Sequence, residues 1–492
     1  MVSAALCWLF ALVVQAQALL MDRGLSALPW NMPWFSGYLQ STTSFALSPL
    51  QVQMFTGFDS PSKALVQGSF AGYINVGPVA NQSYVANTFF WYFPTRASPS
   101  NPRNVIFYFQ GGPGCLVSLF QEVGPLHYYP TNGSVFVNPQ SWDLQADIVF
   151  VDSPVGTGFS YTNSGGPATD ERQIGEMLYS FIRRFLVTFS GLEGANVILA
   201  GESYAGITLP YLAQTIQLRN DIASYTSNGV INLKALLLMS PWIQPKNQYP
   251  GYFRYIMSNW ATQLNNNQTA LTALQGINSA CQAQISALGP VTYIAICESL
   301  LDYMRLFISD LTNGTQCFNE YNVRSGTQDI CPTSFTNGDV VLIGFLNSLI
   351  FRLTTHNFIL GAPRTYIACS NLVQQALEPD GSPASDTVLT QLLNAGLNVY
   401  ITSSQFDIVS SSIGLDAMIA SLTWQGKTGF TSSNQTWTNS DGSQLGSVTS
   451  DRGLTHFRVL NAGHSMPQDN PAAASAVLRK VLSDISIAAA LI

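Results

Sequence analysis

Short apolar runs separated by polar, turn-forming residues recur along the chain. Five of them have the length and composition of buried parallel strands, and they span residues 105–109, 148–151, 197–200, 235–239 and 399–401. Between the second and third runs, the segment 171–189 carries apolar residues at helical spacing, namely Ile174, Leu178, Phe181, Ile182 and Phe185. Strand, helix and strand in this order predict a βαβ unit.

This alternation predicts an α/β fold with a mostly parallel central sheet flanked by helices. Functional side chains are then expected on loops beyond the carboxyl ends of the strands. Residues 246–339 break the pattern, because they form polar, Asn- and Gln-rich segments with four cysteines. We interpret them as an inserted cap stapled by disulfides, between two parts of the core at 19–245 and 340–492. No internal repeat argues for tandem domains instead.

The N-terminal segment has an apolar stretch of signal-peptide length, followed by Ala16-Gln17-Ala18 in the small-x-small form of a cleavage site. We expect residues 1–18 to be removed, leaving no stable membrane span. The alternative is an N-terminal membrane anchor, although the apolar run is short for one. Cleavage would leave six cysteines, an even number suited to an oxidising compartment.

Sites for N-glycosylation support the same route. Five Asn-x-Ser/Thr sequons begin at Asn81, Asn132, Asn267, Asn313 and Asn434. Each alone could arise by chance in an Asn-rich sequence, but together with the leader and the even cysteines they predict a secreted or vacuolar/lysosomal protein.

Charge and short motifs exclude several kinds of partner. The formal net charge is −7, and no Lys/Arg cluster of the kind that follows a phosphate backbone is evident, which argues against nucleic acid. The sequence also has no Cys-x-x-Cys pair, no His-Glu-x-x-His and no phosphate-binding glycine loop. We therefore expect no metal and no nucleotide cofactor.

Ser203 has the setting of a catalytic nucleophile. It follows a predicted strand on a sharp turn, with small residues at Gly201 and Ala205, where close strand-to-helix packing excludes larger side chains. A Gly-x-Ser-x-Ala string can also be a simple helix N-cap, so the assignment depends on partners.

A serine hydroxyl needs a histidine to take its proton and a carboxylate to orient that histidine. His464 lies late in the chain in a glycine-preceded loop after an apolar run, and Asp407 follows the predicted strand 399–401. The order Ser203, Asp407, His464 is that of α/β-hydrolases. Ordinary surface or hydrogen-bonded roles are predicted for the other histidines, His127, His356 and His456.

With these residues in place, the sequence resembles the serine carboxypeptidase family, which has the α/β-hydrolase fold. The matching segments are Gln110-Gly-Gly-Pro-Gly-Cys115, Asn138-Pro-Gln-Ser-Trp142, the block 151–161, Gly201-Glu-Ser-Tyr-Ala-Gly206, Asp407 and Asn461-Ala-Gly-His464. The resemblance covers residues 70–482 and is weakest across the cap. It implies a carboxypeptidase that acts on peptide or protein C-termini through an acyl-enzyme on Ser203, favouring acidic pH.

The resemblance also assigns binding roles. The backbone amides of Gly112 and Tyr204 would form the oxyanion hole, and Gln110, Glu122 and Glu202 would bind the substrate carboxylate. Two departures from the family stand out. Gln110 occupies a position where the family has Asn, and the stretch 115–120 is two residues shorter than usual.

By the same resemblance, Cys115 would be bridged to a cysteine beyond the cap. The cysteine pairs that this implies are Cys115 with Cys369, Cys281 with Cys297, and Cys317 with Cys331. Spacing alone does not fix the connectivity, and a free thiol at Cys115 stays open.

Other activities are compatible with the same motifs. Plant relatives with this scaffold pass an acyl group to an alcohol, so an acyltransferase or an esterase is an alternative. A non-catalytic protective protein on the same fold is a third. Two carboxyl groups at Glu122 and Glu202 suit a peptide carboxylate and favour the peptidase.

Overall fold

The computed structural model describes residues 43–46, 55, 57–77, 86–112, 117–129, 131–162, 166–222, 229–288, 291, 293–324, 337–348, 351–352, 355, 358–359, 362–363, 365–368, 370–377 and 384–490. The chain divides into two compact units, Met1–Thr43 and Ser44–Ile492. The predicted signal peptide lies outside the described residues. The second unit contains all of the described helices.

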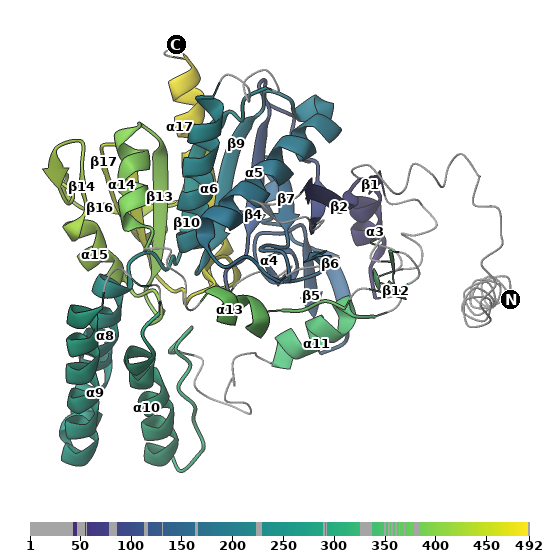
Figure 1. Ribbon diagram of the computed structural model, residues 1–492. Helices are drawn as coiled ribbons and strands as arrows, with labels where there is room; N and C mark the ends of the chain where they lie inside the picture. Colours follow the sequence, from purple (N-terminus) through teal and green to yellow (C-terminus); the bar gives the residue numbers. More distant parts are fainter. Residues whose placement is uncertain are drawn as a thin grey trace, which may run out of the picture. The chain divides into compact units, whose positions relative to one another are not determined.

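A large mixed sheet forms the centre of this unit (Figure 1). Its neighbouring strands are, in order, β2 (Phe70–Gly77), β3 (Ala86–Phe93), β7 (Asp147–Val151), β4 (Asn104–Phe109), β9 (Asn196–Glu202), β10 (Leu233–Met239), β13 (Asn398–Ser404), β18 (Leu454–Val459), β17 (Gln444–Asp451) and β16 (Gln435–Thr438). From β7 to β18 all neighbours are parallel, whereas β2, β3, β17 and β16 pair antiparallel. The predicted mostly parallel α/β fold is confirmed, and the five predicted strands are β4, β7, β9, β10 and β13.

Strand β1 (Thr43–Ala46) adjoins β2 in the same sheet, and β8 (Tyr161–Thr162) pairs with β3. Among the described residues, separate two-stranded sheets are formed by β5 (Leu126–Tyr129) with β6 (Ser134–Val137), by β11 (Phe358–Ile359) with β12 (Ala362–Pro363) and by β14 (Thr423–Trp424) with β15 (Lys427–Thr428). The helices are α3 (Ser60–Gln67), α4 (Val117–Gln121), α5 (Glu171–Thr188), α6 (Ala205–Asn220), α8 (Pro245–Asn265), α9 (Gln268–Ala287), α10 (Ala295–Leu311), α11 (Asn337–Leu346), α13 (Asn371–Leu377), α14 (Asp386–Asn394), α15 (Ser412–Ser421), α16 (Met466–Asp469) and α17 (Pro471–Ala490). The described residues also include two 3-10 turns, η2 (Trp142–Leu144) and η3 (Ser190–Leu192).

Two hydrophobic cores cover the two faces of the sheet, because successive strand residues point to opposite sides. On β4, Val105 and Phe107 join the core under α5, α6, α14 and α15. Ile106 and Tyr108 join the core that includes α4, α11 and α17. The helix predicted from apolar spacing is α5, which begins where the Asp170 side chain accepts a hydrogen bond from the backbone of Gln173 at 2.8 Å.

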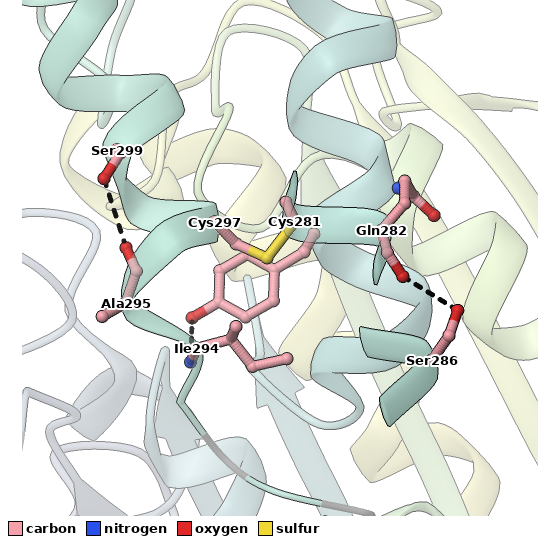
Figure 2. The surroundings of a disulfide bond; sticks show 8 residues. Cys281, Gln282, Ser286, Ile294, Ala295, Cys297 and Ser299 are labelled. Atoms are coloured by element: carbon pink, nitrogen blue, oxygen red, sulfur yellow. Dashed lines mark hydrogen bonds between the residues drawn. A yellow bond between two sulfur atoms is a disulfide. The ribbon is translucent and has the colours of Figure 1, made fainter. Parts of the chain in front are cut away.

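Three helices occupy the sequence predicted as a cap. Helices α8, α9 and α10 contact one another, and α8 packs on α15 (Figure 1). A disulfide between Cys281 of α9 and Cys297 of α10 ties two of these helices together, as Figure 2 shows. The boundaries 246 and 339 stay predictions.

Candidate active site

Ser203 occupies a sharp turn between β9 and α6. Its φ is +60°, a left-handed conformation that is strained for a residue with a Cβ. Two backbone hydrogen bonds hold it there: its N–H donates to the Met239 carbonyl at 3.0 Å, and its carbonyl accepts from the Trp242 N–H at 2.8 Å. A Cβ on Gly201 or Gly206 would come within 2.6 Å of neighbouring atoms, so both positions require glycine. The turn therefore presents the serine at the carboxyl end of a central strand, as a nucleophile elbow does.

Asp407 and His464 meet beyond the ends of two neighbouring parallel strands, β13 and β18. His464 Nδ1 lies 2.9 Å from Asp407 Oδ2, and both side chains are buried. The other carboxylate oxygen, Oδ1, accepts the backbone N–H of Ser410 at 3.0 Å, which fixes the carboxylate. His464 Nε2 is buried without a hydrogen-bond partner among the described residues, so its bond to Ser203 is not formed here. Such bonds often tighten only when substrate is bound.

A second series of Ser, His and Asp side chains joins two neighbouring strands of the sheet to α15. His456 Nε2 is 2.9 Å from Ser403 Oγ, and His456 Nδ1 is 3.3 Å from Asp416 Oδ1. However, Ser403 and His456 are both fully buried within strands, and burial lowers the pKa of His456. Unlike Ser203, Ser403 is not on a turn, so this series suits a structural role. Of the other histidines, His127 lies with Nε2 3.3 Å from the Glu122 carbonyl, and His356 is outside the described residues.

Two buried carboxyl groups lie beside the nucleophile turn. Glu202 directly precedes Ser203, and its Oε1 accepts hydrogen bonds from Gln110 Nε2 at 3.2 Å and from Ser465 Oγ at 3.1 Å. Its Oε2 is buried and has no hydrogen-bond partner in the described part of the chain. Glu122 follows α4, and its Oε2 accepts the Tyr108 hydroxyl at 3.0 Å. The structure thus brings together the three residues expected to bind a carboxylate.

The environment of these carboxyl groups favours their protonated forms. Burial raises the pKa of Glu122. Burial also raises the pKa of Glu202 well above its usual value, and the negative charge of Glu122 raises it further. Two neighbouring buried carboxyl groups do not both ionise readily, so the pair is harder to deprotonate fully than two free carboxyl groups.

The glycine turn after β4 packs directly on the nucleophile turn. A Cβ on Gly111 would lie 2.2 Å from the Glu202 carbonyl oxygen, 2.5 Å from the Tyr204 nitrogen and 2.8 Å from the Ser203 Cβ. Gly112 follows with a φ of +113° and is exposed. Only glycine allows so close an approach of two backbones. The two amides expected in the oxyanion hole therefore come from two segments in contact.

The remaining expected site residues fall into two groups. Asn132, Asn267, Asn313 and Asn434 are exposed, whereas Asn81 lies outside the described residues. Cys317 is disulfide-bonded, in addition to Cys281 and Cys297. Cys115, Cys331 and Cys369 are outside the described residues.

The sequence analysis missed two polar side chains of this site. Ser465 donates to Glu202, and Tyr108 donates to Glu122. Tyr108 stands two positions before Gln110 at the end of a strand, so the period of two would have placed both on one face. Ser465 adjoins His464, but nothing in the sequence pairs it with Glu202.

None of the described helices has the length and hydropathy to cross a bilayer. No group of three or more His, Cys, Asp or Glu side chains among the described residues could bind a metal ion.

Known proteins resemble this chain in sequence and in structure. The family model for serine carboxypeptidases matches residues 61–484. The pheromone-processing carboxypeptidase Kex1 of Penicillium rubens is 31% identical over 458 residues, which cover 88% of this chain and 72% of the relative. The enzyme of the same name from Aspergillus niger is 30% identical over 411 residues, covering 82% and 65%.

The crystal structure of Kex1 from Saccharomyces cerevisiae, a prohormone-processing carboxypeptidase, superposes with a TM-score of 0.73 at 25% identity. The superposition covers 85% of this chain and 91% of that one. The family match spans the nucleophile turn, the glycine turn and the loops that carry Asp407 and His464. This chain belongs to the serine carboxypeptidase family.

Proposed function

We propose that this protein releases C-terminal amino acids from peptides, with Ser203, Asp407 and His464 as the catalytic triad and Gln110, Glu122 and Glu202 as the carboxylate-binding set. The observation that carries the proposal is the bond between Glu202 and Ser465. Glu202 is the chain neighbour of Ser203, and Ser465 is the chain neighbour of His464. A buried carboxyl group with a raised pKa thus lies next to both reacting groups.

In the proposed reaction, Ser203 Oγ attacks the carbonyl carbon of the last peptide bond, and its proton passes to His464 Nε2. The backbone amides of Gly112 and Tyr204 stabilise the developing oxyanion, a contribution of about 3 kcal/mol for each donor. The amino acid then leaves with the proton from His464, and an acyl-enzyme remains on Ser203. Water activated by His464 hydrolyses this ester and regenerates the serine. Asp407 keeps the imidazole oriented through Nδ1.

Recognition of the substrate's end depends on protons held by the glutamic acids. A protonated Glu202 would donate from Oε2 to the terminal carboxylate, since Oε1 already accepts two hydrogen bonds. Gln110 accepts a hydrogen bond from the Ser118 hydroxyl, which fixes its side chain. It provides the amide group that Asn provides at this position in the family. Loss of the protons at neutral pH would replace attraction by repulsion. The proposed pH optimum is therefore mildly acidic.

We also propose a secreted or vacuolar/lysosomal location. The exposed sequon asparagines and the disulfide within the cap support it, because glycosylation and disulfide formation belong to the secretory route.

A fluorophosphonate probe followed by peptide mapping tests the nucleophile. We expect labelling at Ser203 and none in Ser203→Ala. Digestion of a mixed peptide pool by the same preparation, followed by mass spectrometry, should give ladders shortened only from the C-terminus.

Other outcomes would select the alternatives. A Ser203 that does not react would favour a non-catalytic protein. Turnover of an activated acyl ester only in the presence of an added alcohol would favour an acyltransferase.

A further inference from the structure

One short segment of the cap contacts both loops of the Asp407–His464 pair. This segment, residues 318–324, follows α10. Its Glu320 carbonyl accepts the Ile408 N–H at 3.1 Å, and its Val323 N–H donates to the Phe406 carbonyl at 3.0 Å. These two bonds flank Asp407 on both sides.

The same segment bonds to the histidine itself. The Tyr321 carbonyl accepts the His464 N–H at 2.6 Å, and the Tyr321 and His464 rings lie 5.3 Å apart between centroids. A Cβ on Gly463 would lie 2.5 Å from the Tyr321 carbonyl oxygen, so the His464 loop is packed tightly on the segment. Because one segment holds both loops, its position sets the geometry between the Asp407 carboxylate and the His464 imidazole.

Side chains reinforce the contact at the far end of the segment. The Arg324 guanidinium lies over the Phe406 ring, 4.2 Å from its centroid. Asn322 Nδ2 donates to Asp469 Oδ2 at 2.8 Å, and the same oxygen accepts the Gly463 N–H at 2.6 Å. The Arg324 contact joins the segment to the Asp407 loop, and the Asn322 contact joins it through Asp469 to the His464 loop.

An ion pair anchors the near end to α10. Arg305 binds the Glu320 carboxylate through two nitrogens, with Nε 3.3 Å from Oε2. The Glu320 side chain is only 7% exposed, so Arg305 is the cation that compensates its buried charge. Helix α10 is in turn linked to α9 by the Cys281–Cys297 disulfide (Figure 2). A bidentate pair whose carboxylate is buried fixes an orientation more strongly than a fully exposed pair does.

We propose that Arg305 and Glu320 are positioning residues for catalysis, which act through residues 318–324 to hold Asp407 and His464 in register. This inference rests on the proposed triad. It assigns the cap a part in the chemical step. Neither residue contacts the substrate in this account; both act through the backbone bonds at Ile408 and His464.

Three variants of the pair test the proposal. Glu320→Gln removes the charge and leaves Arg305, which is 41% exposed, hydrated and still paired with Asp302. Arg305→Met leaves the buried Glu320 carboxylate without its cation. Arg305→Lys keeps a positive charge but lacks the planar guanidinium that binds both carboxylate oxygens. Small misplacements of catalytic groups lower rates by up to about a hundredfold. We expect kcat per active site to fall about tenfold in Glu320→Gln and more in Arg305→Met, with KM within about twofold of wild type and partial rescue in Arg305→Lys.

The matched control is Arg219→Met, which breaks another bidentate ion pair, between Arg219 of α6 and Glu176 of α5. It should leave kcat unchanged. Active-site titration with a fluorophosphonate separates rate from the fraction of folded enzyme, and the rate of labelling reports how well Ser203 is activated. If Arg305→Met does not fold, Glu320→Gln decides.

The outcomes distinguish the two proposals. Slower turnover and slower labelling per active site in Glu320→Gln, with KM kept, would support the positioning role. If wild-type Ser203 is labelled but Glu320→Gln keeps the wild-type kcat per active site, the positioning role is wrong and the triad stands. If wild-type Ser203 is not labelled, the triad is wrong, and the inference that rests on it falls with it.

Discussion

Asp407 Oδ2 and His464 Nδ1 lie 2.9 Å apart, although the two residues come from different loops. The loops follow β13 and β18, which are parallel neighbours, so both emerge at the same edge of the sheet. Ser203 emerges at this edge too, from β9, with β10 between it and β13. Parallel strands therefore gather residues that lie far apart in the sequence.

The first prediction concerns the orienting carboxylate. Asp407→Asn keeps the size of the side chain but removes the anion, so the histidine loses the correct tautomer and kcat should fall about 10⁴-fold. Ser203→Ala and His464→Ala should be impaired at least as strongly, since losing either one costs about as much as losing the whole triad. Steady-state kinetics with a blocked dipeptide measures this.

The second series of Ser, His and Asp provides the matched control. His456→Gln changes a histidine with similar neighbours, Ser403 and Asp416. It should lower the melting temperature and leave kcat per active site within a few fold. A large loss of kcat in His456→Gln, together with full activity in Asp407→Asn, would show that the second series is the catalytic one and would reject our assignment.

The second prediction concerns the pH dependence of KM. Burial and the neighbouring charge raise the pKa of Glu202, so the group loses its proton only as the pH rises well above the usual carboxylate range. Wild-type KM should increase in that interval. The side chain of Glu202→Gln stays neutral, so the KM of this variant should change little with pH. At neutral pH its KM should be about tenfold below the wild-type value, because one hydrogen bond to a charged group contributes a free energy of about that size. Parallel rises in KM for both proteins would remove Glu202 from carboxylate recognition.

The third prediction concerns stability. Burial raises the pKa of Asp152 from its usual 3.8 to about 8, and its Oδ1 has no hydrogen-bond partner among the described residues. The unfolded chain therefore releases this proton near pH 4, whereas the folded protein keeps it to about pH 8. The contribution of Asp152 to stability is fully present below about pH 4 and falls as the pH rises through this window, by up to about 1.4 kcal/mol per pH unit.

Asp152→Asn removes the titrating group and keeps the acceptor for the Phe159 N–H, which donates to Asp152 Oδ2 at 2.8 Å. Its free energy of unfolding should fall less steeply from pH 4 to pH 8 than that of the wild type. Chemical denaturation at several pH values measures both slopes. Equal slopes would mean that Asp152 is ionised in the folded protein.

The proposed triad could be predicted from the sequence, but the contacts that arrange it could not. Ser203, Asp407 and His464 could be predicted because each follows a recognisable apolar run, and runs of this kind form the centre of a parallel sheet. The Glu202–Ser465 bond could not be predicted, because it joins residues far apart in the sequence whose meeting depends on the packing of several strands. The role of residues 318–324 was also hidden. They mix polar residues with Phe318, Tyr321 and Val323 and show no regular period. Their hydrogen bonds to Ile408 and His464 are made by the backbone, so the order of side chains does not reveal them.

The central claim is that the enzyme recognises a free C-terminal carboxylate through protonated glutamic acids and cleaves the adjacent bond with Ser203. Its most direct test compares kcat/KM for one blocked dipeptide as the free acid and as the amide, from about pH 4 to pH 8, a range that spans the ordinary carboxyl and histidine pKa values. We predict that the free acid is strongly preferred at acidic pH and that this preference shrinks toward neutral pH. Equal efficiency for the acid and the amide at every pH would contradict the account.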